Sequence, residues 1–209
     1  MTDFNPLDFV LRLTVFALAI SVHECAHGWM ANRKGDPTAR DAGRLTLNPI
    51  AHIDPVGTVI VPIVLALTTR FVFGWAKPVP INSYFFRDPK RDVIWVSLAG
   101  PFSNIVFAVV FGILGWVASL VGLYALFTLL YYGVLINLVL AFFNLLPIPP
   151  LDGSHVLEAY LPWPHSETYR NIRPYGFLIL VLLIFSGLLR IYLGVTAAPL
   201  ADLLTKGWF

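Results

Sequence analysis

A long stretch without any charged side chain is the feature of this sequence that most restricts its fold. The 59 residues from Val93 to Leu151 contain no Asp, Glu, Lys or Arg. A charged side chain is costly in hydrocarbon, and about 20 residues cross a bilayer as a helix. The stretch is therefore long enough for two membrane-spanning helices, and we place the turn between them near residues 119–124.

The composition of the whole chain agrees with a membrane protein. Of the 209 residues, 57% are hydrophobic and only 12% are charged, whereas charged residues make up about a quarter of a typical soluble domain. Such a chain is too apolar for intrinsic disorder, and its single cysteine excludes a disulfide scaffold. The net charge of +2 gives no reason to expect nucleic acid as a partner.

Two further apolar stretches complete the set of expected spans. The first covers about residues 7–31, and the last covers about residues 174–195, where Arg190 is near enough to an end for its side chain to reach water. We therefore predict an all-α polytopic membrane protein with about four spanning helices. In this interpretation residues 1–209 form one transmembrane domain, with a core over residues 7–157.

The segment over residues 53–86 needs a different interpretation. Its apolar part, residues 55–69, is 15 residues long and contains Pro62, so it is short for a spanning helix. Pro78 and Pro80 follow, and alternating prolines are incompatible with a helix but suit an extended edge strand. We predict a re-entrant helix and strand element that enters the membrane and returns on the same, cytoplasmic side.

The distribution of Lys and Arg supports this topology, because basic residues concentrate in cytoplasmic loops. If the segment over residues 53–86 is re-entrant, the basic groups before and after it lie on the same side of the membrane. The uncharged turn near residues 119–124 and both termini are then external. The two basic groups are Arg33, Lys34, Arg40 and Arg44, and Lys77, Arg87, Lys90 and Arg91.

The first span carries the residues with the clearest chemistry. His23, Glu24 and His27 form an H-E-x-x-H pattern. Residues four apart share one face of a helix, so both imidazoles can bind one metal ion, with Glu24 beside them as general base for a water molecule at the metal. Two packed histidines and an isolated glutamate are the alternative, but three ionisable groups inside an apolar span favour a metal site.

A catalytic zinc site needs a third protein ligand and an open position for water. Asp152 is the best candidate, because it ends the uncharged stretch directly after a proline-rich segment. The unpaired carbonyl groups of such a segment are tolerable in a membrane only where protein or water lines the site. The other candidates are Asp36, Asp41, His52, Asp54 and His155.

Two motifs together resemble the site-2 proteases, which are intramembrane zinc metalloproteases. They are H-E-x-x-H at residues 23–27 and N-x-x-P-x-P-P-L-D-G at residues 144–153, and two further blocks of the family are similar to residues 74–82 and 99–104. The resemblance covers about residues 13–157. It implies one catalytic zinc ion held by His23, His27 and Asp152, with Glu24 as general base. It also implies that Asn144 holds the substrate backbone or the oxyanion.

The resemblance further implies a compact member without an inserted PDZ domain, in a prokaryotic cell membrane. Its substrates would be transmembrane segments of other membrane proteins, cleaved from the cytoplasmic side in regulated intramembrane proteolysis. A helical substrate must unwind before attack, and an extended strand over Lys77–Asn82 could pair with the unwound segment. The expected substrate-binding residues in this strand are Lys77, Pro78, Val79 and Pro80. The partners are thus membrane-protein substrates and the lipid bilayer, and the sequence does not indicate an oligomeric state.

Several polar residues have two possible roles. Asn104, inside a span, either forms an interhelical hydrogen bond or contacts substrate. His155 either supports Asp152 or belongs to a loop, and the role of Cys25 stays open. Two other classes of protein also remain possible: a catalytically inactive scaffold that binds zinc or helices, and a metal transporter. Transport predicts a polar path across the membrane, whereas the spans over residues 93–118 and 174–195 offer little beyond Asn104 and a few serines.

Overall fold

The computed structural model describes residues 5–68 and 74–208. Within these residues, four helical segments are long and apolar enough to cross a membrane: α1 (Pro6–Arg33), α4 (Pro89–Leu120), Tyr124–Asn144, which comprises the short helix η4 (Tyr124–Leu126) and α5 (Phe127–Asn144), and α9 (Leu188–Thr205). No strand occurs among the described residues. This confirms an all-α polytopic membrane protein with four candidate spans.

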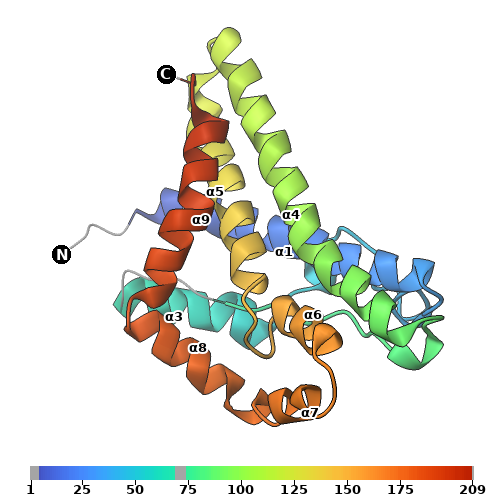
Figure 1. Ribbon diagram of the computed structural model, residues 1–209. Coiled ribbons are helices and arrows are strands. Elements are labelled where there is room, and N and C mark those ends of the chain that lie inside the picture. Colours follow the sequence, from blue (N-terminus) through green and yellow to red (C-terminus); the bar gives the residue numbers. More distant parts are fainter. Residues whose placement is uncertain (1–4, 69–73, 209) are drawn as a thin grey trace.

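Helices α4, α5 and α9 stand side by side, and α1 crosses behind them at a steep angle (Figure 1). The turn between α4 and α5 lies where the sequence predicts it, with Gly122 in the left-handed region at φ 74°. An apolar core fills the space between these three helices, and Trp208, directly after α9, is its largest fully buried side chain. The core residues are Ala108, Ala118, Phe127, Leu130, Val134, Leu138, Ala197, Ala201 and Trp208.

Shorter elements lie at the base of the three upright helices (Figure 1). Between α1 and α4 they are α2 (Thr38–Asp41), η1 (Pro49–Ala51), the π-helical turn η2 (Pro55–Ile60), α3 (Val61–Thr68) and η3 (Ser83–Phe85). Between α5 and α9 they are α6 (Asp152–Tyr160), α7 (His165–Arg170), η5 (Arg173–Tyr175) and α8 (Gly176–Phe185).

The last span differs from the sequence prediction over residues 174–195. The chain breaks after α8, which has only 10 residues, and the helix long enough to span is α9. Gly187 adopts the left-handed conformation, with φ 77°, which ends α8. Counting uncharged residues could not reveal this break, because a glycine in that conformation redirects a helix without adding any charge.

The connection between α1 and α4, which contains residues 53–86, begins and ends at the same end of the molecule. Lys34, just after α1, pairs with Asp92 in the first turn of α4, at 3.0 Å, so the connection begins and ends at the same place, as a re-entrant segment must. Residues 69–73 lie outside the described part. Residues 74–82 form neither a helix nor a strand with any described residue, although the alternate N–H groups of residues 75, 77 and 79 donate to one side, as in an extended chain.

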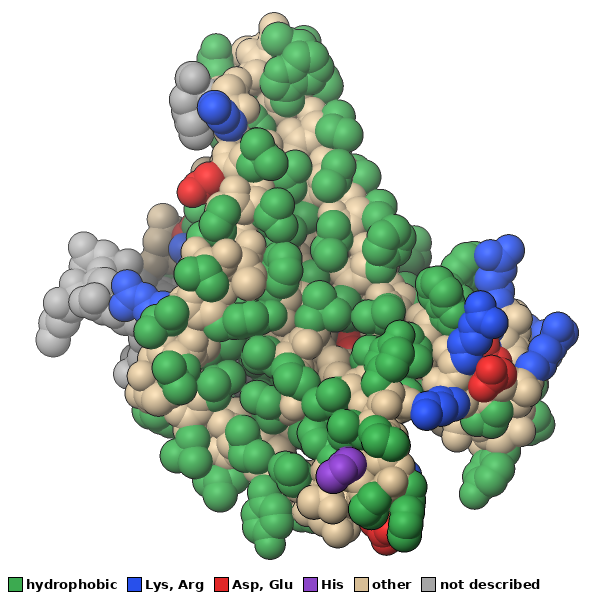
Figure 2. Space-filling model, in the orientation of Figure 1, with side chains coloured by type: hydrophobic (Ala, Val, Ile, Leu, Met, Phe, Trp, Pro, Cys, Tyr) green, Lys and Arg blue, Asp and Glu red, His purple; other side chains and the backbone are tan. Residues whose placement is uncertain are grey.

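Charged and apolar side chains occupy different parts of the surface. Hydrophobic side chains cover the face formed by α4, α5 and α9, as expected for contact with lipid (Figure 2). Lys and Arg side chains gather at one end, over the segments that follow α1 and precede α4 (Figure 2). The two basic groups of the sequence therefore lie on one side of the molecule.

Candidate metal centre

Helix α1 brings His23 and His27 to one face, toward α4 and α6. The helix begins at Pro6, where the side chain of Asn5 accepts hydrogen bonds from the backbone N–H groups of Leu7 and Asp8. The two imidazoles lie one turn apart and are buried, and their Nε2 atoms are only 3.0 Å from each other. The spacing predicted from the sequence thus produces a close pair of nitrogen ligands.

Asp152 completes the group from a distant part of the chain. It is the first residue of α6, directly after the proline-rich loop that follows α5. Its Oδ2 lies 3.2 Å from His23 Nε2, and its Oδ1 lies 3.3 Å from His27 Nε2. Among the described residues, these three are the group of His, Cys, Asp or Glu side chains whose ligand atoms come close enough together to hold a metal ion, within 4.8 Å of one another.

Hydrogen bonds at Nδ1 of each ring determine the tautomer of the two imidazoles. His27 Nδ1 lies 2.7 Å from the backbone oxygen of Val96, and His23 Nδ1 lies 2.6 Å from Asn104 Oδ1. Oxygen atoms of these kinds accept hydrogen bonds, so each Nδ1 carries the proton and each Nε2 presents a lone pair. Two lone pairs and a carboxylate therefore converge on one point, which is the donor set of a cation site.

The carboxyl group of Asp152 also fits this role. Its Oδ2 is buried and accepts no hydrogen bond, which is costly unless a cation is bound. A cation bound between the two imidazoles would stabilise the ionised form of this carboxyl group.

Helix α4 approaches the site closely because residue 100 is glycine. A Cβ atom at Gly100 would lie 2.3 Å from His27 Nε2 and 2.7 Å from His23 Nε2. Any other residue would therefore displace the imidazoles. The absence of a side chain leaves room beside the converging nitrogen atoms.

Asn104 belongs to a buried network and not to an open substrate surface. It is fully buried, and besides His23 it hydrogen bonds through Nδ2 to the backbone oxygen of Ala19 and to Asn137 Oδ1. Asn137 in turn donates to the backbone oxygen of Gly133. Of the two roles considered for Asn104, the interhelical hydrogen bond is the one found here. Two amide side chains within an uncharged stretch indicate such a network, but they do not identify His23 as its partner.

Glu24 lies next to the first ligand and meets the extended segment. Its Oε2 accepts a hydrogen bond of 2.8 Å from the backbone N–H of Val79. Lys77, Pro78 and Pro80 flank this contact, and the side chain of Lys77 is exposed. The segment expected to bind substrate is therefore beside the expected general base.

Asn144 lines an apolar cavity that reaches the site. Its side chain donates to the backbone oxygen of Leu140 at 2.9 Å. The cavity has a volume of about 420 Å³, and its wall includes His23 and Glu24 among mainly apolar side chains of α1, α5, α8 and α9. Glu24 and Asn144 therefore border the same cavity, whose wall is otherwise mainly apolar.

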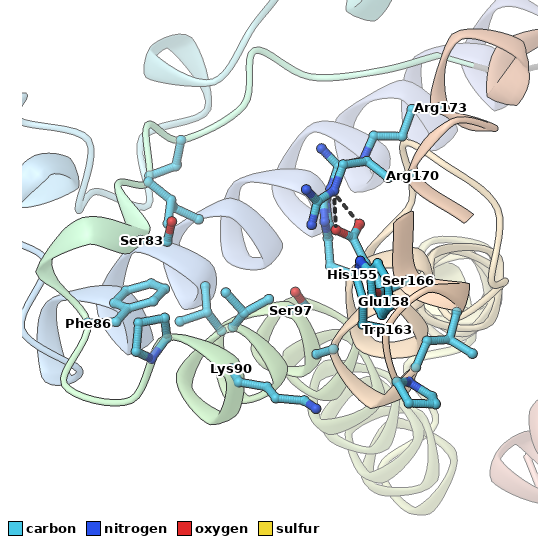
Figure 3. Close-up of a pocket in the computed structure, with 18 residues that line it drawn as sticks. Ser83, Phe86, Lys90, Ser97, His155, Glu158, Trp163, Ser166, Arg170 and Arg173 are labelled. Carbon is cyan, nitrogen blue, oxygen red and sulfur yellow. Dashed lines mark hydrogen bonds and ion pairs between the residues drawn. The ribbon is translucent and has the colours of Figure 1, made fainter. Parts of the chain in front are cut away.

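A second, more polar cavity borders the extended segment at Val79 and is lined by residues of α4, α6 and α7 (Figure 3). It has a volume of about 870 Å³, and Glu158 in it pairs with Arg170 at 3.0 Å and with Arg173 at 2.5 Å. Burial raises the pKa of Glu158, but the two arginines outweigh burial and lower it. Burial and the charge of Arg173 both lower the pKa of His155, which also lines this cavity.

The other sequence candidates for a metal ligand have separate partners. Asp36 is fully buried and accepts hydrogen bonds from the backbone N–H groups of Thr38 and Asn82. His52 Nε2 donates to the backbone oxygen of Thr46. Asp54 accepts from the first N–H groups of η2, and Asp41 pairs with Arg40.

Comparisons with known proteins agree with this site. The sequence profile described as peptidase family M50 matches residues 117–186. Three relatives carry the name "Putative zinc metalloprotease". They are YwhC of Bacillus subtilis (strain 168), 36% identical over 86% of this chain and 83% of its own length; Rip2 of Mycolicibacterium smegmatis, 31% identical over 85% and 68%; and MJ0611 of Methanocaldococcus jannaschii, 37% identical over 75% and 73%.

No solved structure matches this chain. The sequence relatives are nevertheless decisive, because the first of them is 36% identical and is covered over 83% of its own length. Zinc is the metal that these names specify, and two imidazole nitrogens with a carboxylate are a common zinc ligand set. The chain accordingly belongs to peptidase family M50, the site-2 protease family of membrane-embedded zinc metalloproteases.

Proposed function

We propose that this protein is an active intramembrane endopeptidase that hydrolyses peptide bonds within or near the transmembrane segments of other membrane proteins. The observation that carries this proposal is the convergence of His23, His27 and Asp152 next to Glu24. A binding site needs only the three ligands. The additional carboxylate beside them is the group that hydrolysis requires.

The proposed roles follow from the chemistry of each group. His23, His27 and Asp152 would hold the zinc ion, which when bound supplies a Lewis acid for water and for the scissile carbonyl group. Glu24 takes a proton from the attacking water while the oxygen of that water adds to the carbonyl carbon. Glu24 then returns the proton to the amide nitrogen as the C–N bond breaks, and the second proton of the water passes from the new carboxyl group to the amine, so the products are a carboxylate and an ammonium group.

The two cavities support separate routes to the bond that is cleaved. The apolar cavity beside Glu24 and Asn144 suits an unwound stretch of a membrane helix. The polar cavity around Glu158 and His155 suits water and the flanking soluble chain. Basic residues gather at this end of the molecule, so we propose that the polar cavity faces the cytoplasm.

The substrate class follows from this arrangement. A helix in the membrane has its carbonyl groups engaged in hydrogen bonds, so cleavage requires a segment that unwinds readily. Regulated intramembrane proteolysis of signalling proteins would provide such substrates. Asn144, which borders the apolar cavity, is the proposed side chain for holding their backbone.

A reconstitution experiment tests the proposal. The purified full chain is incubated with a single-span reporter protein, with zinc or with a zinc chelator, and the products are identified by mass spectrometry. We expect cleavage within or beside the reporter's apolar segment that stops with the chelator and resumes with added zinc. Binding of the reporter without cleavage would instead identify a scaffold, and zinc flux into vesicles without cleavage would identify a transporter.

A further inference from the structure

We propose that the polar cavity of Figure 3 selects substrates with acidic side chains on the flank that enters it, about three to five residues from the cleaved bond. This inference rests on the proposed protease function and adds a preference among its substrates. It follows from the charges that line the cavity, from the hydrogen-bond donors that these groups leave unused, and from their distance to the metal ligands.

The wall of the cavity carries more positive than negative charge. Its basic side chains come from three elements, with Lys90 in the first turn of α4, Arg170 at the end of α7 and Arg173 at the start of η5. Figure 3 shows Lys90 and the two arginines on different walls of the cavity. Among the described lining residues, Glu158 of α6 supplies the one carboxylate. Three cations therefore surround a single anion.

The carboxylate of Glu158 is already engaged. Its Oε1 accepts from Arg170 Nε at 3.0 Å, and its Oε2 accepts from Arg173 Nη2 at 2.5 Å. Only 15% of the Glu158 side chain is exposed, compared with 60% for Arg170 and 47% for Arg173. Each guanidinium group uses one N–H group in these bonds and has others left. Glu158 thus orients the two arginines, and their remaining donors are available to a second anion.

Two further donors at the cavity have no partner of their own. Lys90 is exposed and forms neither a hydrogen bond nor an ion pair with any residue that the structure describes. The imidazole of His155, which lies beside the ion pairs in Figure 3, also has no hydrogen-bond partner within the described ranges. An anion in the cavity would therefore meet donors from α4 and α6 as well as the arginines. In a protein substrate, the matching group is the carboxylate of Asp or Glu.

Helix α6 sets the distance between these donors and the metal ligands. Asp152, His155 and Glu158 follow one another at intervals of three residues, so each one is the neighbour of the next on the helix surface. Glu158 lies about 9 Å along the axis from Asp152 at 1.5 Å per residue, and an extended chain advances about 3.3 Å per residue. A substrate bond at the metal ligands would therefore place the residue about three positions away, or slightly further, near the arginines.

This preference would restrict the substrates to a minority of membrane proteins. Basic residues concentrate on the cytoplasmic flanks of membrane spans, and the cavity would repel them. The alternative is that the ion pairs of Glu158 only hold α6 against α7 and η5. That role requires neither Lys90 nor any charge on the substrate, so the two explanations predict different results.

Substitution in the substrate flank tests the inference. A set of reporter proteins carries Asp, Asn or Lys at one position at a time along the flank. We measure kcat/KM with the zinc-loaded full chain, and binding to E24Q. At about three to five residues from the cleaved bond, we expect Asp to exceed Asn by about five- to tenfold and Lys to fall below Asn. Because salt screens exposed charges, the ratio of Asp to Asn should decrease at high ionic strength.

A substitution at Lys90 sharpens the test. K90Q removes a cation that has no partner in the described structure, so the fold should be unaffected, and it should lower the ratio of Asp to Asn by about two- to fivefold. R91Q is the matched control, since it makes the same change of charge at the next residue, which is exposed but does not line the cavity. The ratio in R91Q should stay close to that of the unaltered protein.

The phosphate groups of anionic lipids offer the same charge, so a second arm compares vesicles with and without phosphatidylglycerol. An Asp preference of equal size in both supports a substrate carboxylate as the ligand. Activity that depends on phosphatidylglycerol, loses this dependence in K90Q and shows no preference for Asp would assign the cavity to lipid and overturn the inference.

The remaining outcomes separate this inference from the proposed function. Equal cleavage and equal binding of the Asp, Asn and Lys reporters would overturn the preference while leaving the protease intact. Failure of every reporter to be cleaved would instead contradict the proposed function. Binding to E24Q would then still decide whether the cavity prefers an acidic flank.

Discussion

The two halves of α4 pack against their neighbours through different kinds of contact. In the site half, residues 89–104, Val96 accepts from His27, Gly100 admits the imidazoles, and Asn104 bonds to His23. In the apolar half, residues 105–120, the buried residues are small, and they pack against α5 and the end of α9 without polar side chains. The clearest contact there is Gly115 against the ring of Trp208, where a Cβ atom would be only 2.0 Å from the ring.

This difference separates positioning from stability. Lipid tails are as apolar as leucine, so close packing by small residues holds membrane helices together, and polar contacts add orientation. The site half orients two metal ligands through specific acceptors, and the apolar half supplies contact area. Changes in the site half should therefore alter zinc binding and catalysis, whereas changes in the apolar half should alter the stability of the fold.

The largest effect is expected from removing the general base. E24Q should reduce kcat by about 10²- to 10⁴-fold, because the amide cannot accept the proton of the attacking water. Zinc should remain bound, since Glu24 is not among the three converging ligands. Cleavage of the reporter and the zinc content of the same sample are measured together. E167Q, on the exposed surface of α7, is the control and should be fully active, and a fully active E24Q would contradict the assignment.

The next largest effect tests the orienting role of the site half. N104A removes the acceptor of His23 Nδ1, and loss of such a partner lowers metal affinity by about 10- to 100-fold. Competition with a zinc chelator of known affinity measures this change. S119A, at the other end of α4, removes only a hydrogen bond to the backbone oxygen of Trp116. Equal zinc affinity in the two variants would remove the distinction between the two halves.

A third substitution tests the apolar half. G115L places a side chain where the ring of Trp208 lies, and overpacking of this kind costs about 1–3 kcal/mol of stability. Thermal unfolding should therefore occur at a lower temperature, while the folded fraction keeps its affinity for zinc. The double variant G115L/W208A should recover part of the lost stability. A large loss of zinc affinity in G115L would show that the two halves are coupled.

The smallest effect concerns the extended segment. K77A removes an exposed side chain but keeps the backbone bonds to His52 and Arg44. Exposed substitutions of this kind change free energies by about 0.5 kcal/mol or less, so kcat/KM should stay within about twofold of the unaltered protein. R44A, which loses the contact to the Lys77 carbonyl oxygen, should reduce it further. A strong loss in K77A would mean that its side chain, and not the backbone, binds substrate.

Much of the fold and of the ligand set could be predicted from the sequence. The uncharged stretch and the H-E-x-x-H pattern indicated the spans and the imidazole pair, because the cost of a charge in lipid and the period of a helix are local properties. Asp152 followed from the end of that stretch and from the family motif. The structure brings its carboxylate to both rings.

The remaining features depend on contacts that a single sequence does not contain. The bond from Asn104 to His23 requires knowing which face of α4 meets α1. The break at Gly187 depends on a backbone conformation and not on hydropathy. The sequence predicts a strand for the extended segment, but its partners do not form the regular ladder of a neighbouring strand. They are the side chains of Glu24, Arg44 and Thr58 and the backbone oxygens of His52 and Gly57.

The central claim is that two distant parts of the chain hold one zinc ion, and metal analysis tests it most directly. The zinc content of the purified protein is compared with that of D152A and of the control D41A. In the unaltered protein, the carboxylate of Asp41 pairs with the neighbouring Arg40. We predict about one zinc ion per chain in the unaltered protein and in D41A, and almost none in D152A at equal helical content. Full zinc occupancy in D152A would contradict the account.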